Sequence, residues 1–67
     1  MKRDYYVQVN DYMPQVRVQL TESESKAVVY VLEEIVKVCE DALVEISDED
    51  GTILYNNYDE WIKTHRD

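Results

Sequence analysis

The chain has 67 residues and a formal net charge of −8, from 15 acidic and 7 basic side chains. A domain of this size buries only about 60% of the surface of its unfolded chain, so its stability as a monomer is marginal. One cysteine and one histidine exclude an intramolecular disulfide and a zinc site with four Cys or His ligands. Nucleic acids and anionic membranes would repel the chain, so we expect a basic macromolecule as partner and a homodimer as the aid to stability.

The N-terminal sequence MKRDYYVQVN becomes polar too early for a secretory signal peptide. The longest uninterrupted apolar run, residues 27–32, is far shorter than the roughly 18 residues of a membrane span. We therefore expect one domain over residues 1–67, located in the cytoplasm and without a cofactor.

Two strands are expected near the N-terminus. Apolar residues occupy the odd positions from Tyr5 to Val9, and a similar alternation runs from Gln15 to Leu20. A period of two is typical of half-buried strands. The intervening NDYMP contains residues that favour turns, so the two strands are predicted to form a hairpin.

A long helix follows. The sequence TESE is a capping box, in which the Thr21 hydroxyl accepts from the Glu24 amide and the Glu24 carboxylate accepts from the Thr21 amide. Glu22 and Glu24 lie where the helix dipole favours negative charge, which is a sufficient structural explanation for both. We expect the helix to run from about Glu22 to Asp41, although no glycine marks its end.

The apolar face of this helix is wide. At 100° per residue, the apolar side chains of residues 27–43 cover an arc of about 200°, roughly twice what packing on one sheet needs. The surplus predicts a second packing surface, filled by the same chain or, as the small size favours, by a second copy. Cys39 lies within this arc and is expected to be a buried, inert thiol.

A second hairpin is expected after the helix. LVEIS and TILYN flank DEDG, in which Asp50 and Gly51 indicate a tight turn with Gly51 at positive φ. Val44 and Ile46 should point inward and Glu45 outward.

A short C-terminal helix should complete the domain. Asn57 can cap it, and one of its sides would cover an edge of the core with Tyr58, Trp61 and Ile62. The predicted fold is α+β, of order ββαββα, with a mostly antiparallel sheet packed on one long helix.

Catalytic and metal sites are not supported. SDEDGTI resembles part of an EF-hand loop, but with Gly51 at position six the motif needs Asp at Ile46 and Glu at Asn57. Weak surface binding of Ca²⁺ is the remaining alternative. No nucleophile has a base and an orienting group at hand, because Cys39 is expected in the core and His65 in solvent near the C-terminus. We expect a protein that is not an enzyme.

The aromatic residues are six tyrosines and one tryptophan. Those on apolar faces are expected in or beside the core: Tyr5, Tyr55 and Trp61. Tyr30 lies among charged helix positions and, with Tyr12 and Met13 in the first turn, is a candidate for partner contact. Packing of Tyr30 in the core is the alternative.

Acidic residues are concentrated in the second half of the chain. Ten lie between residues 33 and 60, opposed by Lys37 alone: Glu33, Glu34, Glu40, Asp41, Glu45, Asp48, Glu49, Asp50, Asp59 and Glu60. On the helix, Glu33 and Glu40 are seven residues apart, as are Glu34 and Asp41, so each pair shares one edge about 10 Å apart.

Rows of carboxylates can occupy a basic surface that otherwise binds rows of phosphates. The favoured hypothesis is therefore a DNA mimic that blocks a basic DNA-binding protein, with the ten acids, Tyr30, Tyr12 and Met13 as its contact residues. Two alternatives remain open. One is an antitoxin-like or adaptor module that binds through an apolar face, and the other is an acidic surface that serves only solvation.

The overall character of the chain, in size, charge, tyrosine content and lack of catalytic residues, resembles that of small acidic proteins with which bacteriophages disable host machinery. This group includes anti-restriction and anti-CRISPR DNA mimics and Bacillus-phage inhibitors of the nucleoid protein HU. The resemblance implies a homodimer in the bacterial host cytoplasm that competes with DNA for a basic, HU-like protein.

Overall fold

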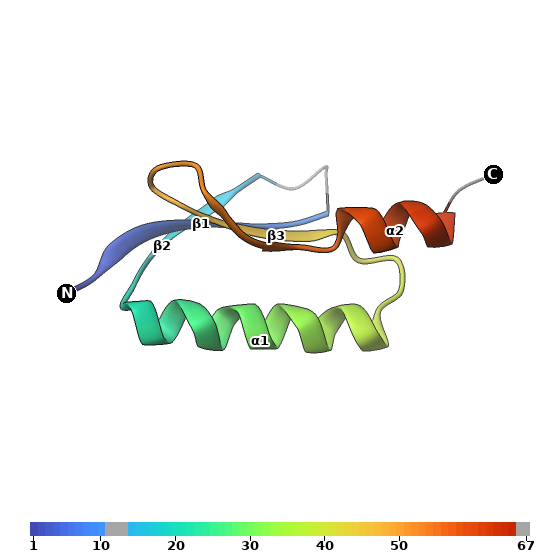
Figure 1. Cartoon of the computed structure of the whole chain (residues 1–67), viewed down its shortest axis with the longest axis horizontal. Coiled ribbons are helices and arrows are strands. Elements are labelled where there is room, and N and C mark those ends of the chain that lie inside the picture. The colour runs from blue at the N-terminus through green and yellow to red at the C-terminus, as the bar shows by residue number, and fades with distance from the viewer. Residues whose placement is uncertain (11–13, 66–67) are drawn as a thin grey trace.

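The computed structural model describes residues 1–10 and 14–65. It confirms the order ββαββα and the α+β class. The elements are β1 (Arg3–Val9), β2 (Val16–Leu20), α1 (Glu22–Val38), β3 (Val44–Asp48), β4 (Ile53–Asn56) and α2 (Tyr58–His65). One layer is a four-stranded sheet, and α1 lies across one of its faces as the second layer (Figure 1).

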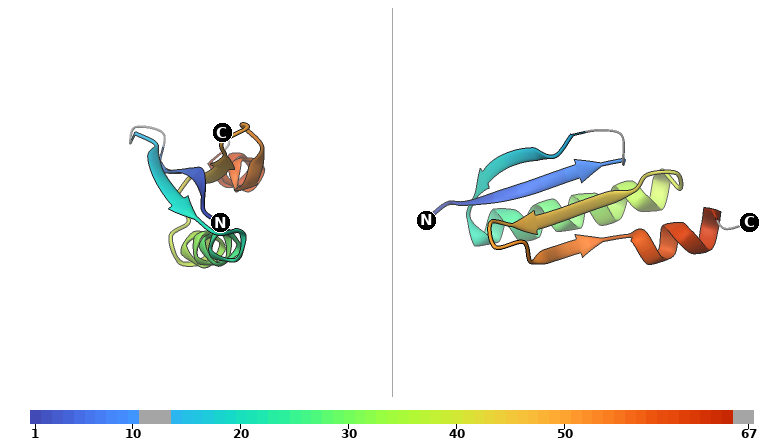
Figure 2. Two further views of the ribbon diagram at one scale, coloured as in Figure 1. Left: turned by 90° about the vertical axis from the view of Figure 1, so that its left-hand side faces the viewer. Right: turned by 90° about the horizontal axis from the view of Figure 1, so that it is seen from above.

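The strands lie in the order β2-β1-β3-β4, and each neighbouring pair is antiparallel (Figure 2, right). Both β2 and β3 flank β1, so α1 connects two parallel strands across the central one. Val7 is paired with Val16 on one side and with Ile46 on the other, which brings apolar residues from three strands to one face. Neither the strand order nor this crossover follows from the sequence pattern alone.

Helix α1 begins as predicted. The Thr21 hydroxyl accepts from the Glu24 amide at 3.1 Å, and the Glu24 carboxylate accepts from the Thr21 amide at 2.8 Å. These bonds to the ionised form lower the pKa of Glu24. The helix ends at Val38, three residues before the expected end at Asp41, because the chain turns there and the Ala42 amide donates to the Cys39 carbonyl.

The core is small and centred on β3. Among the described residues the buried apolar side chains are Tyr5, Leu32, Ala42, Val44 and Ile46. Val44 and Ile46 point inward as predicted, at 1% and 0% exposed, and Glu45 on the opposite face is half-buried. Partly buried apolar residues of β1, β2 and α1 surround this centre.

The β3–β4 turn also follows the prediction, since Gly51 has a φ of 85°. One oxygen of the Asp48 carboxylate accepts from the amides of Asp50 and Thr52, both at 2.9 Å. Asp48 therefore holds the turn together. A β-bulge follows at Ile46 and Ser47.

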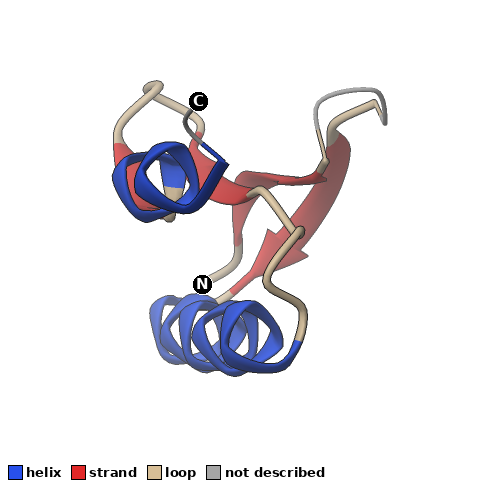
Figure 3. Ribbon diagram, turned by 90° about the vertical axis from the view of Figure 1, so that its right-hand side faces the viewer, coloured by secondary structure: helices blue, strands red, loops and turns tan. Residues whose placement is uncertain are grey.

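The β1–β2 hairpin rises away from α1, on the side of the molecule opposite α2 (Figure 2, left; Figure 3). Tyr5 of this hairpin is buried, but its other inward apolar residues are only partly covered, and Val16 is 56% exposed. Cys39 lies on this uncovered side and is exposed, so the predicted buried thiol is wrong. Cys39 does lie on the side of Val9 and Ile35, as its place in the apolar arc predicts, but the sheet does not cover this end of the helix.

Helix α2 continues in line with β4 beyond the end of the sheet (Figure 2, right). Trp61 is half-buried and its indole N–H donates to the Asp41 carbonyl, whereas Tyr58 and Ile62 are exposed. Trp61 therefore lies against the α1–β3 connection and is not among the described residues that pack on the buried core, so the expected cover of the core edge by Tyr58, Trp61 and Ile62 is wrong.

Asn57 occupies the position before α2, but its side chain does not cap the helix as predicted. It is buried, with its amide nitrogen donating to the Ala42 carbonyl at 2.7 Å and its oxygen accepting from the Val44 amide at 2.8 Å. Asn56 accepts from the Tyr58 amide instead. The Asn57 side chain bonds these two backbone groups rather than the start of α2, because both groups are buried and have no access to water. No helix in the described part of the chain is long and apolar enough to cross a membrane.

Candidate functional site

A groove of about 290 Å³ lies between α1 and α2. Val36 lines it from α1, Glu40 lines it from the α1–β3 connection, and Glu60, Trp61 and Thr64 line it from α2, with Asn57 also in the lining. We call this the α1–α2 groove. It combines two carboxylates with the exposed part of an indole ring, so it offers both charge and aromatic surface to a partner.

Tyr55 on β4 shows that further charge gathers beside this groove. Burial raises the pKa of the Tyr55 phenol above its usual value, and the nearby carboxylates of Glu33 and Glu60 raise it further, while Lys37 acts in the opposite direction. The predicted edge pairs Glu33–Glu40 and Glu34–Asp41 are wrong, because α1 ends at Val38 and both Glu40 and Asp41 follow the helix. Glu33 and Glu60 lie near Tyr55, whereas Glu40 and Glu60 line the α1–α2 groove.

Two short-range ion pairs border the same surface. Glu34 pairs with Lys37 at 3.4 Å and Glu60 with Lys63 at 3.8 Å, all with side chains about half exposed or more. Such exposed pairs contribute about 0–1 kcal/mol each, so an incoming cationic group can displace these lysines. Among the described residues, no Lys or Arg forms an ion pair with Glu33 or Glu40.

The acids of the β3–β4 turn lie at the opposite end of the sheet from the α1–α2 groove (Figure 1). Arg3 pairs there with Glu49 at 3.2 Å and Asp50 at 3.5 Å, and the hydrogen bond that Arg3 donates to the Glu49 carboxylate raises the pKa of the guanidinium. Sequence reasoning missed Arg3, which is 46 residues from Glu49. Asp48 accepts hydrogen bonds within the turn, and Glu49 and Asp50 pair with Arg3. This group of acids therefore offers less negative charge to a partner than its sequence suggests.

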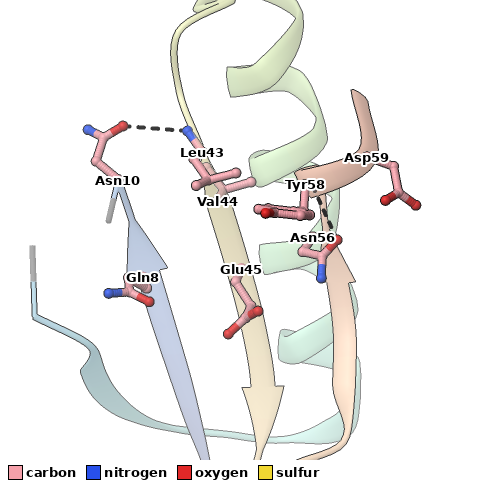
Figure 4. Close-up of a pocket in the computed structure, with 8 residues that line it drawn as sticks. All are labelled: Gln8, Asn10, Leu43, Val44, Glu45, Asn56, Tyr58 and Asp59. Carbon is pink, nitrogen blue, oxygen red and sulfur yellow. Dashed lines mark hydrogen bonds between the residues drawn. The ribbon is translucent and has the colours of Figure 1, made fainter. Parts of the chain in front are cut away.

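Glu45 and Asp59 lie in a third place, on the sheet face that α1 does not cover. Both line a shallow depression of about 270 Å³, bordered by Gln8, Asn10, Leu43, Val44, Asn56 and Tyr58. Figure 4 shows that the lining side chains come from β1, β3, β4, the start of α2 and the residues beside these strands, and that Asp59 points away from Glu45. The Asn10 oxygen accepts from the Leu43 amide, so part of this polar lining has a structural role.

The remaining predicted contact residues are dispersed. Tyr30 is 65% exposed, so it does not pack in the core, and it lies beside Val31 and Val38 on the outer face of α1. Asp41 lies in the α1–β3 connection next to Trp61. Tyr12 and Met13 lie outside the described residues. Trp61, assigned to the core edge from the sequence, is the aromatic residue that the structure places among the acids.

No group of three or more His, Cys, Asp or Glu side chains in the described residues is arranged to hold a metal ion. Comparisons with protein-family models, with curated proteins and with solved structures find no match to this chain.

Proposed function

We propose that this protein binds a basic DNA-binding protein through its acidic surface and thereby excludes DNA from that protein, with no catalytic step. The observation that carries the proposal is that Glu40 and Glu60 line the α1–α2 groove beside a half-buried tryptophan, with Glu33 and Glu60 both near Tyr55. An HU-like nucleoid protein is the first candidate partner, because its DNA-binding surface would present the matching rows of Lys and Arg.

The acids do not form one continuous row comparable with a DNA strand. They lie in three places along a molecule 44 Å long: at the α1–α2 groove, at the β3–β4 turn, and around Glu45 and Asp59. A single DNA strand carries about one phosphate per 3.4 Å and a duplex about one per 1.7 Å. Since several carboxylates are engaged by Arg3, Lys37 and Lys63, the chain can replace a short stretch of backbone only.

Charge alone gives fast encounter and orientation, whereas affinity needs a few desolvated anchors. Trp61 in the α1–α2 groove and Tyr30 on the outer face of α1 are the aromatic residues available for this role. Arg or Lys of the partner can stack on the Trp61 ring while Glu40 and Glu60 compensate the charge.

The test starts with a pull-down from a bacterial lysate. It continues with a gel shift in which the protein competes with a labelled DNA duplex for the captured partner and for purified HU. We expect displacement of DNA that weakens as salt is raised. Capture of a partner that binds no nucleic acid, or no displacement at low salt, would refute the proposal.

Two variants of equal charge localise the site. Glu40→Gln and Glu60→Gln in the groove, with Glu33→Gln near Tyr55, together remove three charges, and Glu22→Gln, Glu49→Gln and Asp50→Asn remove three at the other end. At about 0.5–1 kcal/mol per exposed charge, the groove variant should bind roughly 10- to 150-fold more weakly. The control should lose clearly less. Equal losses would show that net charge acts without a site.

A further inference from the structure

The two long edges of α1 differ in chemistry. Glu33 lies on the edge toward β4, near Tyr55. Ile35 lies on the other edge, where it borders Val9 of β1. At 100° per residue, Val31 and Val38 lie on this second side, and they are 53% and 81% exposed. We call this apolar side of α1 the β2-side flank.

Strand β2 borders the same flank and is an edge of the sheet. Its inward row consists of Val16, Val18 and Leu20, none of which is buried, so the row extends the core toward solvent. Residues 14–20 contain no acid. The acids closest to this strand in sequence are Asp11, Glu22 and Glu24, and the Glu24 carboxylate accepts from the Thr21 amide. Two further acids lie nearby with partners of their own: Asp4 on β1 accepts from Gln19, and Glu34 beside Val31 and Val38 pairs with Lys37. In a chain of charge −8, a strand edge that carries Arg17 and no acid repels a second copy less than the unpaired acids do.

From these observations we propose that a second copy of the chain docks here, by antiparallel pairing of β2 with β2 of the partner around a two-fold axis at Val18. A strand edge offers unpaired backbone groups to such a copy. Centring on Val18 places Val16 opposite Leu20 and Arg17 opposite Gln19. A two-fold axis at Arg17 would instead place the Arg17 side chains of the two copies opposite each other, and such a pair of like charges is destabilising.

This pairing also brings the two α1 helices together. Helix α1 packs against β2 and β3 and therefore runs under β1, between them. The two β1 strands would be three strand spacings apart, about 14 Å. Side chains of Val31 and Val38 from both copies can fill the space beneath the joined sheet. The result is one eight-stranded sheet whose uncovered apolar row becomes internal.

The size of the surface is sufficient. A specific interface of standard size buries about 600–1000 Å² per partner, and the chain exposes 5061 Å². The smaller figure is roughly an eighth of that area, comparable with the edge of one five-residue strand and the adjoining flank of a 17-residue helix.

Sedimentation equilibrium of the full chain measures this directly. We expect a mass of about 16 kDa, twice the 8.0 kDa of one chain, at high micromolar concentration. Association should strengthen with added salt, because salt screens repulsion between two chains of charge −8. The complex with a basic partner should show the opposite dependence, so failure of either idea is recognised separately.

Lysine substitutions locate the interface. Val16→Lys on β2 and Val31→Lys on α1 should each weaken dimerisation at least tenfold, with circular dichroism confirming that the fold is retained. Ile53→Lys is the matched control, because Ile53 is 51% exposed on the other sheet edge, β4. Val31 is on an exposed helix face, so its variant remains informative if Val16→Lys does not fold.

A monomeric wild type, dimerisation unaffected by both test variants, or dissociation caused by Ile53→Lys would each overturn the inference. A wild type that stays monomeric and instead binds a different protein, in a manner abolished by Val31→Lys, would assign the flank to an adaptor role.

Discussion

Asn57 provides the clearest test of the fold. Its buried side chain forms hydrogen bonds to two backbone groups, the Val44 amide and the Ala42 carbonyl. Replacing it with Ala leaves the Val44 amide and the Ala42 carbonyl unsatisfied, in residues that are 1% and 8% exposed. Each such group costs about 1–3 kcal/mol, so Asn57→Ala should lower the free energy of unfolding by about 2–5 kcal/mol. A 67-residue domain has only about 3–10 kcal/mol in total.

Urea unfolding followed by circular dichroism measures this loss. With a slope of about 1 kcal/mol per molar urea, the midpoint should fall by about 2 M or more. The adjacent Asn56→Ala is the matched control, because Asn56 is exposed and accepts one 3.3 Å bond from Tyr58. It should cost less than about 1 kcal/mol. Equal losses for the two asparagines would refute the assigned role of Asn57.

Asn57→Asp refines the same test. The carboxylate keeps an acceptor for the Val44 amide but places a second oxygen opposite the Ala42 carbonyl. Protonation restores a donor at that position, and burial favours the protonated form and raises its pKa in the folded state. Its deficit relative to wild type should therefore be smaller at pH 4 than at pH 7, and a deficit independent of pH would contradict the geometry.

Three further outcomes are expected. Thr21→Ala removes the cap of α1 and should cost about 0.5–2 kcal/mol in urea unfolding. Gly51→Ala should cost about 1–2 kcal/mol from positive φ alone, because an added Cβ meets no atom within 4 Å. Neutralising Glu33 and Glu60 should lower the raised pKa of Tyr55, measured as tyrosinate absorbance against a Tyr55→Phe reference. The stability that follows from this raised pKa is complete below about pH 10 and is lost as the pH rises further.

Patterns that depend on neighbouring residues were predicted well from the sequence. The capping box at Thr21 and the positive φ of Gly51 require only a few adjacent residues, and both are confirmed. The inward position of Val44 and Ile46 follows from a period of two, which a strand fixes wherever it lies in the sheet. These features fix the elements and their order.

Features that depend on distant partners were not predicted correctly. Asn57 could be assigned a cap from its position, but its side chain bonds residues 13 and 15 positions away. Arg3 lies beside the acids of the β3–β4 turn only because β1 pairs with β3. Cys39 points along the apolar arc as expected and is still exposed, because the curvature of the β1–β2 hairpin decides how far the sheet covers the helix.

The same dependence governs the candidate site. The periodicity of α1 places Glu33 on one edge and Val31 and Val38 on another, but the predicted pairing of Glu33 with Glu40 fails because the helix ends at Val38. Only the crossover from β2 through α1 to β3 determines that the edge with Glu33 faces β4 while the second faces β2. Glu34 beside Val31 and Val38 is paired with Lys37. A second copy on the β2-side flank would leave the α1–α2 groove accessible in each chain, so self-association and binding of a basic partner are sterically compatible.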